Sequence, residues 1–219
     1  MSEYKTKSCH QFGQKEIVVY TDSQSGLDPS WLVGFLEKSV AEGRRYKSGE
    51  TIQVGWMVLL LKENESGGLD LLEPQFDSIP IKWTLGVNNT LRHLILQKSI
   101  ADLLKVEPEF PSLRQSGLAS KSFLLTRNQQ EFCMKRVISI GNDSGWQFST
   151  ISFVNQDAEF RSLYELSFYQ MAIVPFLALP SGACIAKSSD ELVIELAGTS
   201  VSSKENPLLL EIAQSKILI

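Results

Sequence analysis

The first half of the chain carries apolar positions at both strand and helix spacing. Residues 17–20 form a short apolar run that predicts a strand, and Asp28-Pro29 is typical of a helix start, with an N-cap side chain and a proline in the first turn. Apolar residues then recur at helical spacing over residues 29–43, which predicts a helix with one buried face; they are Leu32, Phe35, Leu36 and Val40. Residues 51–62 alternate apolar side chains on both faces and predict one strand covered on both sides.

Residues 64–121 contain glycine- and proline-rich stretches that mark a turn, the end of a helix and a connection between domains. The glycine-rich stretch 64–68 predicts a turn, with a return strand at 69–72 that completes a hairpin. A second helix is expected from Thr84 to about Lys105, where Pro108 and Pro111 end it. Residues 107–121 combine prolines, glycine and serines, so we expect the connection between two domains there.

The second half predicts short strands around one helix. Strands are expected at residues 123–126, 134–140 and 146–153, and a hairpin at 183–187 and 191–196. Ser162 and Glu165 have the spacing of a capping box, which predicts a third helix to about Val174, ended by Pro175. Asn206-Pro207 could begin a terminal helix whose apolar side chains are Leu208, Leu209, Ile212 and Ile217.

Together these elements predict an α+β fold with two small mixed domains, each with a mainly antiparallel sheet and amphipathic helices. The expected parts are an N-terminal α/β region at residues 1–110, a C-terminal domain at 118–198, and a tail or docked helix at 199–219. The dipeptide Gly-Trp occurs once in each half, at Gly55-Trp56 and Gly145-Trp146, which permits a distant duplication without requiring one.

Composition narrows the function. Of 219 residues, 43% are hydrophobic and 21% charged, and the net charge of −4 lies outside the signatures of disorder and of a basic nucleic-acid-binding surface. The first thirteen residues lack the apolar core of a signal peptide, and no apolar run reaches the roughly 20 residues that span a bilayer. Three widely separated cysteines suit a reducing compartment. We therefore expect a cytoplasmic protein that binds neither nucleic acid nor membranes.

The residues that carry common chemistry are sparse. The Walker, Rossmann, nucleophile-elbow and zinc-protease motifs do not occur, and the two histidines, His10 beside Cys9 and His93 in a predicted helix, have no ligand cluster around them. We expect His93 to lie partly exposed on the surface. Several carboxylates could pair for acid–base work or bind a cation, although surface positions explain them equally well; they are Asp70, Glu73, Asp77, Asp143, Asp157 and Glu159. The sequence thus predicts no enzyme, no catalytic residue, no metal site and no cofactor.

The segment 142–146, Asn-Asp-Ser-Gly-Trp, is the most informative. Asp143 and Ser144 can bond nearby backbone amides, Gly145 permits an otherwise forbidden dihedral angle, and Trp146 supplies a large anchoring side chain. One interpretation is structural, a tight turn that fixes a core tryptophan. The other is that the turn belongs to a recognition surface, because loop tips held by a rigid sheet often carry binding groups.

This motif resembles one found in a known family. Asp143-Ser144-Gly145-Trp146-Gln147-Phe148 is similar to the Asp-Ser-Gly-Trp motif of a bacterial domain family of immunity proteins from toxin systems. Three segments of the first half resemble the longer architecture, in which an additional α/β region precedes that domain; they are Trp31-Leu32-Val33-Gly34-Phe35-Leu36-Glu37, Ile52-Gln53-Val54-Gly55-Trp56-Met57 and Leu91-Arg92-His93-Leu94-Ile95-Leu96-Gln97-Lys98. The similarity covers roughly residues 15–196.

The resemblance implies a pure binder. It transfers no catalytic residues and implies a protein that binds and neutralises a cognate toxin, such as a secretion-system effector, inside the cell. Asp143, Ser144, Gly145 and Trp146 are then candidates for partner contact or for a structural turn. The alternatives are a small-molecule-binding or regulatory module, with a ligand between the halves, and a carboxylate-based enzyme.

Overall fold

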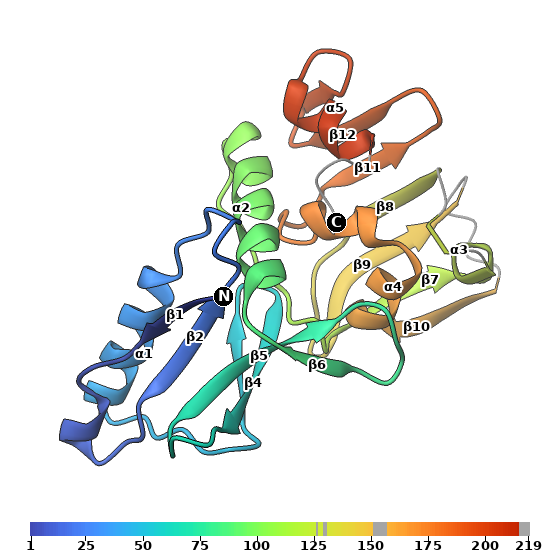
Figure 1. Ribbon diagram of the computed structural model, residues 1–219. Coiled ribbons are helices and arrows are strands. Elements are labelled where there is room, and N and C mark those ends of the chain that lie inside the picture. The colour runs from blue at the N-terminus through green and yellow to red at the C-terminus, as the bar shows by residue number, and fades with distance from the viewer. Residues whose placement is uncertain (126, 129–130, 151–156, 215–219) are drawn as a thin grey trace. The chain divides into compact units, whose positions relative to one another are not determined.

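The computed structural model describes residues 1–125, 127–128, 131–150 and 157–214. Helices and two mixed sheets make up the chain, so the predicted α+β class is confirmed (Figure 1). The chain divides into two compact units, Met1–Leu94 and Ile95–Ile219. The division falls inside helix α2 (Asn88–Leu103), earlier in the chain than the 107–121 segment in which the connection was expected.

The first unit is built on a six-stranded sheet. Its strands run in the order β1-β2-β5-β4-β3, with β6 paired to β5, and every pair is antiparallel except β2 with β5. In chain order the elements are β1 (Ser2–Lys5), the 3-10 turn η1 (Cys9–Phe12), β2 (Ile17–Thr21), α1 (Ser30–Ala41), β3 (Thr51–Val54), β4 (Met57–Glu63), β5 (Leu69–Gln75), β6 (Lys82–Leu85) and the start of α2. The parallel pair is possible because α1 and the β3–β4 hairpin lie between β2 and β5 in the chain.

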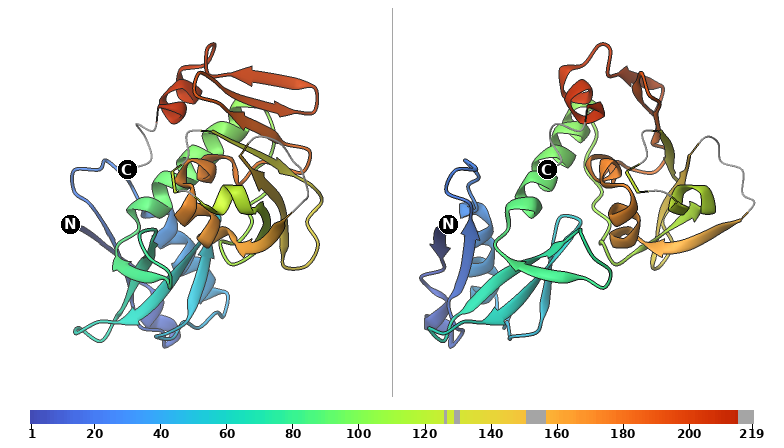
Figure 2. Two further views of the ribbon diagram at one scale, coloured as in Figure 1. Left: turned by 90° about the vertical axis from the view of Figure 1, so that its right-hand side faces the viewer. Right: turned by 45° about the vertical axis from the view of Figure 1, so that its right-hand side comes forward.

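Helix α1 covers one face of this sheet (Figure 2). Leu32, Leu36 and Val40 are fully buried among strand residues such as Val19 and Leu61. Phe35, which was expected on the same face, is instead 48% exposed. That expectation was wrong because Phe35 lies about 100° around the helix from Leu36, beyond the stripe that contacts the sheet.

Two boundaries in the first unit differ from the sequence prediction. Residues 51–62 form two antiparallel strands, β3 and β4, because Gly55 turns the chain with a φ of +59°. Helix α2 begins at Asn88, since residues 82–85 pair with β5 as strand β6 and Gly86 follows at a φ of +108°. The hairpin of β4 and β5 is confirmed, and Asn64 accepts hydrogen bonds from the amides of Ser66 and Gly68 in its turn.

The second unit holds a seven-stranded sheet in the order β10-β7-β9-β8-β11-β12-β13, antiparallel apart from the pair β7 and β9. Its elements after α2 are β7 (Ser116–Ser120), α3 (Lys121–Leu125), β8 (Phe132–Arg136), β9 (Asp143–Ser149), β10 (Ala158–Ser162), α4 (Leu163–Tyr169), the 3-10 turn η2 (Met171–Phe176), β11 (Cys184–Lys187), β12 (Leu192–Leu196), β13 (Thr199–Ser202) and α5 (Pro207–Ala213).

Local signals in this unit are confirmed. Ser162 and Glu165 form a reciprocal capping box at the start of α4, and Asn206 accepts a hydrogen bond from the Leu209 amide at the start of α5. The predicted hairpin is that of β11 and β12. Leu209 of α5 is fully buried, so the helix packs onto its unit.

Several strand predictions are corrected. Residues 121–125 form helix α3, whereas a strand was expected at 123–126. Strand β8 ends at Arg136, short of the expected residue 140, and β9 begins at residue 143, three positions early. The helix predicted to residue 174 ends at Tyr169, and the chain continues as η2 with Pro175 inside it. Thr126, residues 151–153 and Ile217 of these predictions lie outside the described residues.

Among the described residues, none of the helices combines the length and the apolar character needed to cross a bilayer.

Candidate functional site

The Asp-Ser-Gly-Trp motif lies at the start of β9, directly after the loop that joins it to β8. Ser144 and Trp146 are completely buried, Gly145 is buried, and Asp143 is half-buried. Three of the four candidate residues are therefore inaccessible to a partner. The structural interpretation of the motif agrees with this burial, and each residue has an identifiable contact.

Gly145 allows two backbone segments to touch. Its φ is +77°, and a Cβ atom there would lie 2.1 Å from the Val137 carbonyl oxygen. The Val137 amide donates to the Gly145 carbonyl at 2.8 Å, so the chain after β8 folds directly over the glycine. Any side chain would push this segment away, and a left-handed conformation favours glycine in any case.

Asp143 fixes the loop from the other side. Its Oδ1 accepts a 2.9 Å hydrogen bond from the Gly145 amide. Its backbone N–H and C=O exchange bonds of 3.1 and 3.2 Å with Ile140, and its carbonyl also accepts from the Ser139 hydroxyl at 2.7 Å. Asp143 thus bonds four atoms of the loop and the motif.

Ser144 and Trp146 fasten the loop to the body of the unit. The Ser144 hydroxyl donates to the Ser116 carbonyl of β7 at 2.7 Å. The Trp146 indole N–H donates to the Leu177 carbonyl at 3.0 Å, next to η2. Since these acceptors come from distant parts of the chain, the motif joins a neighbouring strand and a turn to β9.

Arg136 makes further contacts beside the tryptophan. We call Arg136 and the motif residues Asp143, Ser144, Gly145 and Trp146 together the frame. Its guanidinium carbon lies 5.8 Å from the centre of the Trp146 ring. Nε donates to the Ser144 carbonyl at 3.2 Å, and Nη1 donates to the carbonyls of Glu109 and Leu179 at 2.9 and 2.6 Å. Burial lowers the pKa of Arg136, and the Glu109 carboxylate, 3.7 Å away, partly opposes the shift. Arg136 therefore serves as a buried cross-link between four segments.

The frame presents an exposed apolar segment, residues 137–140, which we call the hairpin tip. The side chains of Ile138 and Ile140 are 75% and 76% exposed. Val137, which directly follows β8, is 41% exposed. Sequence reasoning missed these residues, because residues 134–140 were predicted to form one strand. Apolar side chains on a loop held this firmly form a candidate protein-binding surface, since a rigid loop loses little entropy on binding.

The histidines do not form a second site. His93 was expected to be partly exposed, but it is 5% exposed and packs against the rings of Trp56 and Phe76, with centroid separations of 5.6 and 5.7 Å. Burial lowers its pKa to about 3, with a smaller contribution from Arg92. The prediction failed because helix α2 turns this side toward the aromatic residues of the first unit. His10 is exposed, and its Nδ1 lies 2.8 Å from Glu16.

The carboxylates considered from the sequence are dispersed. Glu73 is buried and accepts hydrogen bonds from the amides of Asn89 and Thr90 and from the Thr90 hydroxyl, at 2.8 to 3.0 Å, which places it as the cap of α2. Burial raises the pKa of Glu73 despite these bonds. Within the described ranges, no group of three His, Cys, Asp or Glu residues is arranged to hold a metal ion.

Comparison with protein-family models, with curated proteins and with solved structures finds no match.

Proposed function

We propose that the protein is a cytoplasmic immunity protein that binds a cognate bacterial toxin and neutralises it by protein–protein contact. The observation that carries this proposal is the hairpin tip, where Ile138 and Ile140 are about three-quarters exposed on a frame built by the Asp-Ser-Gly-Trp motif. The motif supplies the resemblance to immunity proteins, and the tip supplies a surface that fits a protein partner.

The energetics of the tip favour binding to an apolar pocket. Burying an isoleucine side chain contributes about 1.5–3 kcal/mol, so two of them can supply a substantial part of a protein interface. The frame keeps the two side chains in place before the partner arrives, which lowers the entropic cost of association. A net charge of −4 favours encounter with a basic toxin, although the field is weak.

The test is protection of cells against a toxin, and the candidate is a toxin gene that lies beside the gene for this protein. Bacteria that express that toxin are scored for growth with the wild-type protein, with the double variant Ile138→Ser/Ile140→Ser, and with Leu125→Ser. Leu125 is a matched control, because it is 81% exposed and lies on α3 of the same unit. Affinity for the purified, catalytically inactive toxin is measured by calorimetry.

We expect wild type and Leu125→Ser to protect and to bind, whereas the double variant loses protection and at least tenfold in affinity without losing stability. Failure of the wild type to protect or to bind would overturn the proposed function. Full protection by the double variant would exclude the hairpin tip as the toxin contact.

A further inference from the structure

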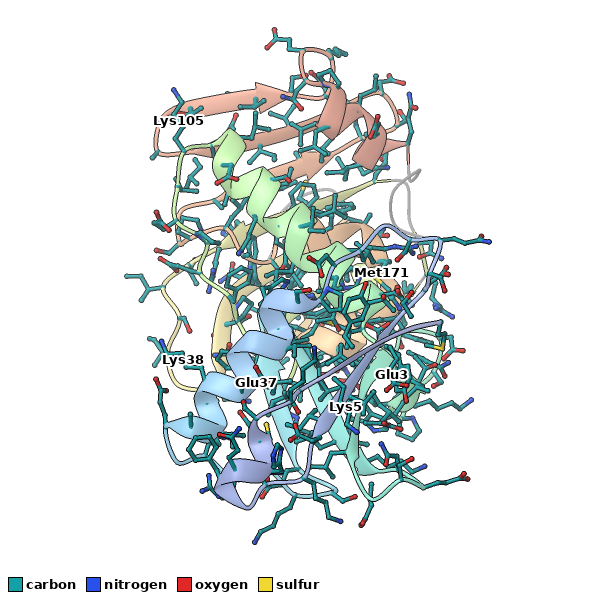
Figure 3. The ribbon with its side chains drawn as sticks, turned by 60° about the vertical axis from the view of Figure 1, so that its left-hand side comes forward. Glu3, Lys5, Glu37, Lys38, Lys105 and Met171 are labelled. Carbon is teal, nitrogen blue, oxygen red and sulfur yellow. The ribbon has the colours of Figure 1, made fainter. Side chains whose placement is uncertain are left out.

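A groove runs between strand β1 and helix α1 in the first unit. It has a volume of about 420 Å³ and is lined by Glu3, Tyr4, Lys5 and Lys7 from the β1 side and by Ser30, Val33, Gly34 and Glu37 from α1. Figure 3 shows Glu3 and Lys5 on β1 and Glu37 on the neighbouring helix. Strand β1 is the outermost strand of its sheet, so this groove lies along the sheet's edge.

Within the part of the chain that the structure describes, β1 pairs with β2 alone, so its outer edge lies open beside this groove. Ile17 accepts from the Thr6 amide, whereas the carbonyls of Glu16 and Tyr20 accept from Leu69 and Val87 on the opposite side of β2. The backbone N–H and C=O groups of the odd-numbered residues of β2 therefore point toward β1, and those of the even-numbered residues point away from it. Because Glu3 pairs with Tyr20 and Lys5 with Val18, the N–H and C=O groups of Glu3 and Lys5 point outward, away from β2.

The far wall of the groove is kept open by a glycine. The α1 residues that line it are spaced i, i+3, i+4 and i+7, and thus share one helix face. A Cβ atom at Gly34 would meet nothing within 4 Å, although glycine inside a helix costs about 1 kcal/mol relative to alanine. Glu37 closes one end, because its carboxylate accepts from the amides of Lys7 and Ser8 at 2.5 and 3.2 Å.

We propose that a second copy of this chain fills the groove, with the two β1 strands paired antiparallel about Tyr4. In this register Glu3 of one copy faces Lys5 of the other, and Lys5 faces Glu3. Both residues carry the outward backbone groups, so each facing pair can exchange two hydrogen bonds, four in all. The side chains that meet have opposite charges, which is the favourable arrangement for directly facing cross-strand residues.

The self-complementary register is the reason to prefer a second copy over an unrelated strand. A lysine on an edge strand normally discourages pairing, because it meets no matched charge. Here the chain supplies the matching glutamate two residues away, and only a twofold arrangement about Tyr4 brings both pairs together. The twofold axis also places both α1 helices on the same face of the joined sheet. This inference is independent of the proposed toxin binding.

The experiment is sedimentation of the full-length protein over a range of concentrations, with charge reversals at the register pair. Wild type is expected to form a species of twice the 24.5 kDa chain mass. Glu3→Lys and Lys5→Glu each place like charges opposite one another, so each should weaken dimerisation by roughly tenfold. An equimolar mixture of the two variants restores both attractive pairs, and so does the double variant E3K/K5E.

The controls carry the same change of charge elsewhere on the first unit. Glu65→Lys and Lys47→Glu alter exposed residues away from β1 and are expected to dimerise as wild type does. Amide hydrogen exchange at Glu3 and Lys5 should slow as the protein concentration rises, whereas the exchange of the Tyr4 amide, which is bonded to β2, should not change.

A wild type that stays monomeric at every concentration overturns the proposal. A dimer that is indifferent to both reversals, or two variants that fail to associate when mixed, overturns it as well.

Discussion

The two buried Gly-Trp tryptophans differ in one hydrogen bond, and that difference predicts how each tolerates replacement by phenylalanine. Trp146 and Trp56 are 0% and 1% exposed. The indole N–H of Trp146 donates to the Leu177 carbonyl at 3.0 Å. The indole N–H of Trp56 is buried without a hydrogen-bond partner in the part of the chain that the structure describes.

The magnitude follows from what each substitution leaves behind. Both changes remove the same atoms from a packed site, so the loss of apolar contact and the cavity are similar and largely cancel in a comparison. Trp146→Phe also leaves the Leu177 carbonyl without its donor, which costs about 1–3 kcal/mol. Trp56→Phe removes an unpaired buried donor and with it a desolvation penalty of similar size. We expect Trp146→Phe to cost at least about 2 kcal/mol more than Trp56→Phe.

The assay must report on each unit by itself, because two units need not unfold together. Native-state hydrogen exchange, read from peptides of residues 1–94 and of residues 95–219, gives the free energy of opening for the unit that carries each substitution. Equal losses of opening free energy in the two variants, or a larger loss for Trp56→Phe, would refute the reasoning from the hydrogen bond.

Three further predictions concern single positions. Gly145→Ala should lower the free energy of unfolding, measured by heat or urea, by at least about 2 kcal/mol. The reason is that alanine resists a φ of +77° and that its Cβ would lie 2.1 Å from the Val137 oxygen. A variant as stable as the wild type would contradict the close approach. His93 has a pKa of about 3 when folded, below the ordinary 6.5, so stability present above pH 6.5 is lost as the pH falls toward 3, by up to about 1.4 kcal/mol per pH unit. His93→Gln should remove that part of the slope, and an unchanged pH profile would argue against the buried neutral ring. Gly34→Ala should raise the stability of α1 by about 0.5–1 kcal/mol while weakening dimerisation in sedimentation; a stabilised variant that dimerises fully would show that the groove wall tolerates a methyl group.

Local signals were the part of the fold that sequence could predict. The capping box of Ser162 and Glu165 and the N-cap of Asn206 depend on residues three positions apart, so the sequence contains the whole interaction. The strand prediction at residues 123–126 was wrong for residues 123–125, which belong to α3, because whether a short apolar segment forms a helix or a strand depends on distant neighbours. His93 was misplaced for the same reason, since its burial comes from Trp56 and Phe76, far from it in the chain.

The candidate site also contains parts that the sequence predicts and parts that depend on the fold. The sequence predicted that Gly145 and Trp146 were special, because glycine and tryptophan have few substitutes where a turn meets a core. One of its two interpretations, a turn that fixes a core tryptophan, agrees with the burial of Trp146. The sequence could not predict that the motif holds a loop on which Ile138 and Ile140 are exposed. The motif and the contact surface are therefore separate groups of residues joined by backbone hydrogen bonds at Val137 and Ile140. Val137 and Ile140 contact the motif through their backbone in those bonds, whereas the Ser139 hydroxyl donates to the Asp143 carbonyl. The side chains of Val137, Ile138 and Ile140 can therefore be exchanged without removing a hydrogen bond of the motif, and partner choice can be altered at these positions at little cost in stability.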